Sequence, residues 1–159
     1  MTSKNKNNKA QEVAKYILYL ANSNKEEVTN KKLQKLVYYS QAWSLVINNK
    51  KLFNEEIEAW VHGPAIRSLY TEYKHFGFNP IEEKIKISDI TLTKKEKDLI
   101  NQVWNVYGKF DAGYLEMLTH SEKPWQEARR GLEGYENSDA EISTDTMKKF
   151  YKEKLEAVK

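Results

Sequence analysis

The chain of 159 residues contains no cysteine. This absence excludes disulfides, thiolate catalysis and cysteine-ligated zinc, and it fits a cytoplasmic protein. The six glycines form no phosphate-binding loop. No apolar run approaches the roughly 18 residues of a membrane span, and residues 1–9 lack the apolar stretch of a signal peptide. The sequence therefore predicts neither a membrane partner nor a secreted protein.

Outside the first nine residues, positive and negative side chains balance. The net charge is +3, and Lys4, Lys6 and Lys9 lie in a segment without acidic residues. We predict that residues 1–9 are a disordered basic tail and that residues 10–159 form one domain. The electrically neutral body disfavours nucleic acid as a partner, because binding to phosphates depends on clustered positive charge.

Charge is nevertheless uneven along the body. Residues 133–146 carry five acidic side chains and no lysine or arginine. These side chains are Glu133, Glu136, Asp139, Glu141 and Asp145. Lys31, Lys32 and Lys35 gather at the start of a predicted helix. We interpret both groups as solvated surface in preference to a patch that steers a partner.

Apolar periodicity predicts a mainly α protein: a single compact domain of about six helices with at most a small two-stranded β element. Long helices are expected over 10–21, 30–48, 93–107 and 144–158, and shorter ones over 65–75, 111–118 and 124–131. Thr93 and Glu96 have the spacing of a capping box. Residues 132–142 form a predicted acidic loop.

One segment has the alternating pattern of a strand. Ile57, Ala59 and Val61 alternate with more polar positions over residues 55–61. Residues 85–87 could pair with this strand or run along the surface. Gly63 and Pro64 then break the chain, and Pro64 suits the first position of the 65–75 helix.

Two short cassettes, residues 58–70 and 118–128, each combine a tryptophan, a histidine and a proline. We interpret five of these residues as structural, because a large ring can close a corner beside a proline-initiated helix. They are Trp60, Gly63, Pro64, Pro124 and Trp125. Four others are candidate contacts with a partner: His62, Arg67, Tyr70 and His120.

The histidines provide little evidence for catalysis. None lies in a metalloprotease motif, and none accompanies a nucleophilic serine elbow. His62, His120 and Asp111 would form a hydrolytic site only if the fold joined them, and two histidines alone make a weak metal site. We therefore predict no enzyme, metal or cofactor. The alternative is a small hydrolase or nucleotide-handling enzyme that uses His62 and His120.

A DNA-binding helix is also not expected. Residues 31–41 superficially resemble a recognition helix, but apolar residues occupy more than one face of it. Such a helix belongs in the core of the protein.

Four motifs in order resemble the Panacea domain of SocA-like antitoxins, a phage-associated group. They are residues 32–42, Leu52-Phe53, residues 58–64, and Thr119-His120 with Pro124-Trp125. The similarity runs from about Gln11 to Arg130. One departure is Ala65, where the family pattern has valine.

The resemblance implies an antitoxin that binds a toxin encoded beside it. Members of the family serve toxins of several unrelated kinds, and one of them delivers its toxin to a protease. The implied partner is thus a cognate toxin protein, with a protease as a further partner if this chain is also an adaptor.

Overall fold

The structure is a computed structural model that describes residues 9–158. Seven α-helices occur in this part of the chain. They are α2 (Lys9–Ser23), α3 (Asn30–Ile47), α4 (Arg67–Tyr73), α5 (Lys94–Tyr107), α6 (Ala112–His120), α7 (Lys123–Ala128) and α8 (Thr144–Ala157). Strands β1 (Glu58–Trp60) and β2 (Gly63–Ala65) form a small hairpin, and single turns of 3-10 helix span Lys74–Phe76 and Ile87–Asp89. The predicted mainly α fold is confirmed.

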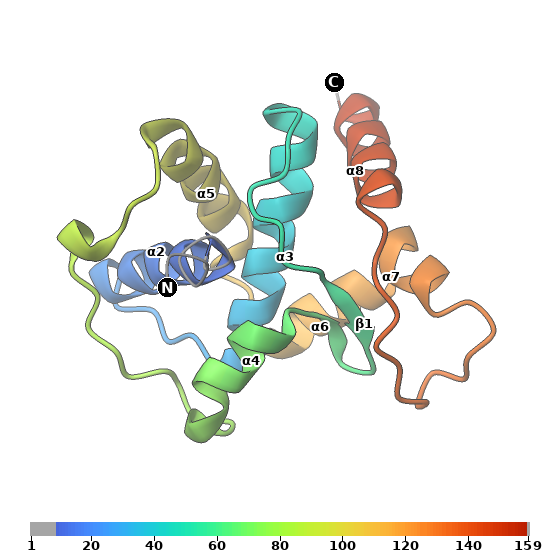
Figure 1. Cartoon of the computed structure of the whole chain (residues 1–159), viewed down its shortest axis with the longest axis horizontal. Helices are drawn as coiled ribbons and strands as arrows, with labels where there is room; N and C mark the ends of the chain where they lie inside the picture. Colours follow the sequence, from blue (N-terminus) through green and yellow to red (C-terminus); the bar gives the residue numbers. More distant parts are fainter. Residues whose placement is uncertain (1–8, 159) are drawn as a thin grey trace, which may run out of the picture.

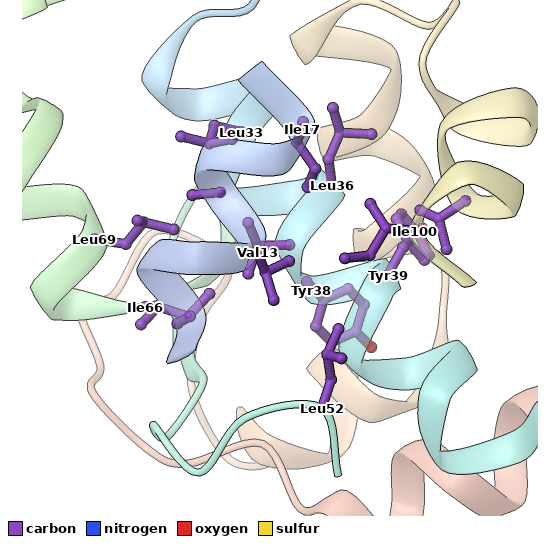
Figure 2. Close-up of a cluster of buried hydrophobic side chains, with 14 of the residues drawn as sticks. Val13, Ile17, Leu33, Leu36, Tyr38, Tyr39, Leu52, Ile66, Leu69 and Ile100 are labelled. Atoms are coloured by element: carbon purple, nitrogen blue, oxygen red, sulfur yellow. The ribbon is translucent and has the colours of Figure 1, made fainter. Parts of the chain in front are cut away.

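Helix α3 is the centre of the domain, with 14 of its 18 residues buried. It lies between α5 and α8 (Figure 1) and also packs against α2 and α6. Ile17 of α2, Leu36 of α3 and Ile100 of α5 meet in the core cluster shown in Figure 2. A helix that contacts neighbours on most sides must be apolar on more than one face, which explains its sequence pattern.

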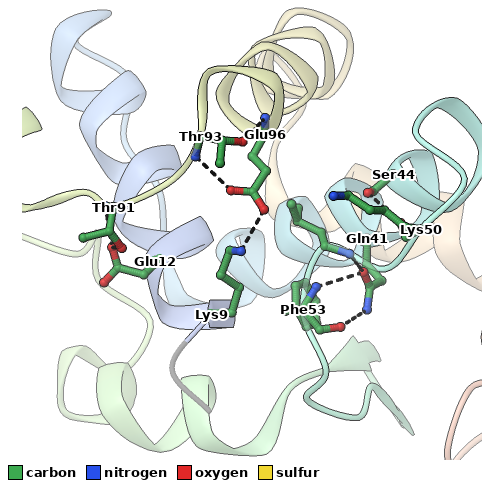
Figure 3. Close-up of polar contacts among 10 residues, drawn as sticks. Lys9, Glu12, Gln41, Ser44, Lys50, Phe53, Thr91, Thr93 and Glu96 are labelled. Carbon is green, nitrogen blue, oxygen red and sulfur yellow. Dashed lines mark hydrogen bonds and ion pairs between the residues drawn. The ribbon is translucent and has the colours of Figure 1, made fainter. Parts of the chain in front are cut away.

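Side-chain caps set several helix starts. Thr29 accepts a hydrogen bond from the Lys32 amide at 3.2 Å. Thr93 and Glu96 form the predicted capping box, with bonds of 3.1 and 2.9 Å. Glu96 also pairs with Lys9 at 2.7 Å, which joins α2 to α5 (Figure 3). Helix α2 thus begins one residue before its predicted start, and residues 1–8 of the predicted tail lie outside the described residues.

Polar side chains of α3 hold the segment that returns toward the hairpin. The Gln41 amide nitrogen donates to the Phe53 carbonyl and its oxygen accepts from the Leu52 amide, both at 2.7 Å. Ser44 donates to the Lys50 carbonyl at 2.8 Å. These contacts, drawn in Figure 3, fix the approach to β1 from the C-terminal half of α3.

The hairpin corrects the prediction for Pro64. The strands pair antiparallel, with Glu58 opposite Ala65 and Trp60 opposite Gly63. Pro64 therefore lies in β2, and α4 begins only at Arg67. A φ of +112° at Gly63 admits the reversal, and proline is tolerated because β2 lies at the edge of the sheet.

The segment that pairs with the region of β1 is not residues 85–87, as the sequence allowed, but the end of the acidic loop. Residues 85–87 form no strand; a 3-10 turn begins at Ile87. The Ala59 amide donates to the Ala140 carbonyl at 2.8 Å, and the Ile142 amide donates to the Ile57 carbonyl at 2.7 Å. The loop therefore lies beside the hairpin although some eighty residues separate them in the sequence.

Candidate functional site

The two cassettes meet through Trp125. Its indole nitrogen donates to the Trp60 carbonyl at 2.8 Å, and only 9% of the residue is exposed. Its ring stacks on His120 with centroids 3.9 Å apart and planes 15° apart. Pro124 lies in the first turn of α7, which directs Trp125 inward toward the hairpin. Trp125 thus joins the end of α6 and the start of α7 to β1.

The sequence suggests that the Trp60 ring closes a buried corner, but Trp60 is only half-buried. Its half-buried ring and the Tyr70 ring form an edge-to-face pair with centroids 5.1 Å apart, and the Arg67 guanidinium lies 5.3 Å from the Trp60 ring centroid. Glu58 accepts from the Trp60 indole and from Arg67, both at 2.8 Å. These four residues, which we call the hairpin surface, form an exposed stack of rings and paired charges.

An open cavity of about 560 Å³ lies between the hairpin surface and the acidic loop. Its lining comes from the hairpin, from the start of α4 and from the loop. The lining residues are Trp60, Val61, His62, Arg67, Tyr135, Asn137, Ser138 and Asp139. Tyr135 is 78% exposed and stands at the loop side of the cavity. We call this hollow the loop cavity.

Arg129 holds the acidic loop in place. It is 4% exposed, and its guanidinium donates to the Ala59 carbonyl at 2.9 Å and to the Glu133 carbonyl at 3.1 Å. It also donates to the Glu136 carbonyl and packs over the Trp125 ring at 5.1 Å. Its hydrogen bonds go to backbone carbonyls and not to the loop carboxylates. Arg129 lies four residues after Trp125, but nothing in the sequence pattern marked it as an anchor.

A polar group lies on the side of the hairpin that faces α6. His62 has 71% of its side chain exposed, and its Nδ1 is 3.6 Å from the Glu116 carboxylate. Lys31 pairs with the same carboxylate. Burial opposes ionisation of Glu116, but the hydrogen bond and charge of Lys31, with the charges of His62 and His120, lower its pKa overall.

Lys35 departs most from the prediction that Lys31, Lys32 and Lys35 form solvated surface. It is 2% exposed, and burial lowers its pKa to about 7. A Cβ at Gly63 would lie 2.5 Å from Lys35 Cε and 3.0 Å from Thr119 Oγ1. The glycine therefore provides the space that the lysine stem fills. Lys32 is buried as well and donates to the Gly108 carbonyl at 2.7 Å.

His120 lies under the exposed surface. Its Nε2 is buried and has no hydrogen-bond partner within residues 9–158. Burial lowers its pKa, and the charges of Lys35 and Arg129 act in the same direction. The Glu116 carboxylate opposes this shift. The imidazole stacked on Trp125 is suited to support the hairpin from below.

The hydrolytic triplet considered from the sequence does not form. Asp111 caps α6 by accepting from the Tyr114 amide at 2.8 Å. His120 ends the same helix, nine residues later, which at 1.5 Å per residue places the two about 13 Å apart along the axis. In the part of the chain that is described, no group of three histidine or acidic side chains is arranged to hold a metal ion.

Glu122, also in the second cassette, is a residue that the sequence did not single out. It is 3% exposed and accepts from Tyr39 at 2.8 Å, from Tyr151 at 2.7 Å and from Lys154 at 2.9 Å. Burial and the Glu122 carboxylate raise the pKa values of Tyr39 and Tyr151. This network ties the α6–α7 junction to α3 and α8, which lie far away in the sequence.

A second hollow, of about 190 Å³, lies where α5 and α8 flank the C-terminal half of α3. Trp43, Ile47, Val106 and Leu155 contribute to its mostly apolar lining. Val106 is 54% exposed and Ile47 is 47% exposed. We call it the apolar groove, and it is a rival surface for partner contact.

A family model described as antitoxin SocA-like, Panacea domain, matches residues 33–126. The match covers more than half of the 159 residues. The chain belongs to the SocA-like Panacea family. Comparisons with curated proteins and with solved structures gave no match.

The Panacea match extends from α3 into α7, so it includes the hairpin and nearly all of the second cassette. The predicted resemblance is therefore confirmed. Membership in an antitoxin family suggests an antitoxin role and a toxin as partner, and it suggests a non-enzymatic role. No helix among residues 9–158 has the length and apolar character needed to cross a membrane.

Proposed function

We propose that this Panacea domain is an antitoxin that neutralises the toxin encoded in the adjacent gene by binding it directly. The observation that carries the proposal is the family match over residues 33–126. Direct binding is favoured because the histidines are not assembled for catalysis: His62 faces solvent and His120 stacks against Trp125.

The proposed toxin contacts are on the hairpin surface. Tryptophan, tyrosine and arginine are the residues most enriched among interface hot spots. Trp60, Arg67 and Tyr70 lie together, and 60% of the Arg67 side chain is exposed. His62 extends this surface. His120 is proposed to act indirectly, because its ring supports Trp125, which in turn holds the Trp60 backbone.

Co-expression with the adjacent gene tests the proposal. Wild-type chain should restore growth and should co-purify with the toxin. Tyr70→Ala should weaken the complex about tenfold or more, because it removes an exposed ring at a proposed hot spot. Phe78→Ala is the matched control: Phe78 is 97% exposed and lies outside the hairpin surface, so the complex should be unchanged.

The remaining outcomes separate the alternatives. Growth rescue without any complex would refute direct binding. His62→Gln or His120→Gln variants that fold and bind normally but fail to rescue would instead support the enzyme alternative. A shortened toxin half-life in cells, dependent on a host protease, would show that this chain is an adaptor that delivers its toxin for proteolysis.

A further inference from the structure

The loop cavity has two walls of different origin. One wall is the hairpin with Arg67, and the other is the acidic loop with Tyr135 and Asp139. Figure 1 shows the loop returning from α7 alongside the hairpin before it enters α8. The hollow is open to solvent, so it suits a side chain presented by another molecule.

Hydrogen bonds within the chain hold both walls of the cavity. Arg129 binds the Ala59 carbonyl on the hairpin side and the Glu133 and Glu136 carbonyls on the loop side. The backbone pairing of Ala59 with Ala140 closes the other end of the loop. A prearranged surface loses little conformational entropy on binding, which favours affinity.

Carboxylates outnumber cations around the cavity, although its lining itself holds one of each, Asp139 and Arg67. The acidic loop carries four carboxylates and neither lysine nor arginine. Arg129 is buried beneath it and is engaged by carbonyls. The Arg67 charge is already matched by Glu58 at 2.8 Å, and Glu58, followed by Asp139, raises the pKa of Arg67. Arg67 thus lies within electrostatic reach of Asp139, but Asp139 and the other loop carboxylates form no salt bridge among residues 9–158.

The aromatic rings add a second preference. A guanidinium or ammonium group binds favourably over the face of tryptophan or tyrosine. Arg67 already shows this contact, since it lies over Trp60 and pairs with Glu58. Tyr135 and Asp139 place a ring and a carboxylate on the opposite wall, and no cation among residues 9–158 lies over the Tyr135 ring.

We infer that the loop cavity is the docking site for a basic segment of the toxin, with an arginine or lysine side chain held by Tyr135 and Asp139. This inference rests on the proposed function, because it names the chemistry of the toxin surface that meets this chain. The same excess of carboxylates disfavours phosphate-bearing ligands such as nucleic acid.

The affinity of the purified complex, measured by titration calorimetry over a range of salt concentrations, tests the inference. Tyr135→Ala and Asp139→Lys should each weaken binding about tenfold or more at low salt, and Asp139→Lys should also flatten the salt dependence. Tyr135 and Asp139 are exposed, so both variants should remain folded. The matched controls are Phe78→Ala for the ring and Glu156→Lys for the charge, and both should bind as wild type.

A complex that forms and rescues growth, but responds to Tyr135→Ala and Asp139→Lys no more than to the controls, would overturn the inference and leave the proposed function standing. The same holds if Val106→Asp in the apolar groove breaks the complex while both cavity variants bind normally. If instead Asp139→Lys changes the stability of the full chain but not of a chain lacking residues 1–8, the basic tail occupies the cavity and the toxin assignment is wrong.

A probe without the toxin keeps the two proposals separable. A tetra-arginine peptide should bind the wild-type chain and should lose about tenfold in affinity with Asp139→Lys. A tetra-glutamate peptide should not bind. If no toxin complex forms but tetra-arginine binding depends on Asp139, the proposed function fails and the cavity chemistry is retained. If tetra-arginine binds the Asp139→Lys variant as tightly as the wild type, the inference is refuted.

Discussion

Replacing Lys35 by methionine should stabilise the protein, with a characteristic dependence on pH. The residue is 2% exposed, and its pKa falls from 10.5 to about 7 through burial. Methionine is unbranched and apolar, so it can follow the same path past Gly63 without the cost of a buried ammonium group.

The magnitude follows from the difference between the two pKa values. At about 1.4 kcal/mol for each pKa unit, a fall from 10.5 to about 7 corresponds to an upper limit of about 5 kcal/mol. Below pH 7 both the folded and the unfolded chain hold the proton, so the full penalty is present. Between about pH 7 and pH 10.5 the unfolded chain binds more protons, so the free energy of unfolding of the wild type rises with pH.

Urea denaturation of wild type and Lys35→Met, followed by circular dichroism in steps from about pH 6 to pH 10, measures this difference. The advantage of the variant should be largest near pH 6 and should shrink by up to about 1.4 kcal/mol per pH unit above pH 7. Lys152→Met, an exposed change on α8, should show no such trend. A difference between Lys35→Met and wild type that stays constant across this range would refute the burial of Lys35 as a neutral amine.

Two further substitutions test how the cassettes support the hairpin. Trp125→Ala should cost about 3–5 kcal/mol in urea denaturation, because it removes a ring in a residue that is 9% exposed, whereas Trp60→Ala should cost less than half as much because its ring is half-buried. Gly63→Ala should cost about 1–3 kcal/mol, measured in the same way, because a side chain at φ +112° is strained and its Cβ would meet Lys35 Cε. An unchanged midpoint for Gly63→Ala would show that the hairpin reverses without this conformation.

Local features of the sequence determined most of the helical architecture. The Thr93–Glu96 capping box and the apolar periodicity of α5 depend on residues within a few positions of each other, so the helix could be predicted before its neighbours were known. The motifs around residues 32–42 and 58–64 likewise identified the family without any tertiary information.

Contacts between distant segments decided the rest. Pro64 has the local signature of a helix start, but pairing between β1 and β2 places it in a strand. The local sequence predicts a solvated Lys35, but α6 and Gly63 enclose its side chain in the fold. The acidic loop acquires its shape from Arg129 and from β1, which precedes it by some eighty residues. Burial, pKa and the loop cavity are properties of surfaces that meet only in the folded chain, and no local pattern encodes which surfaces those are.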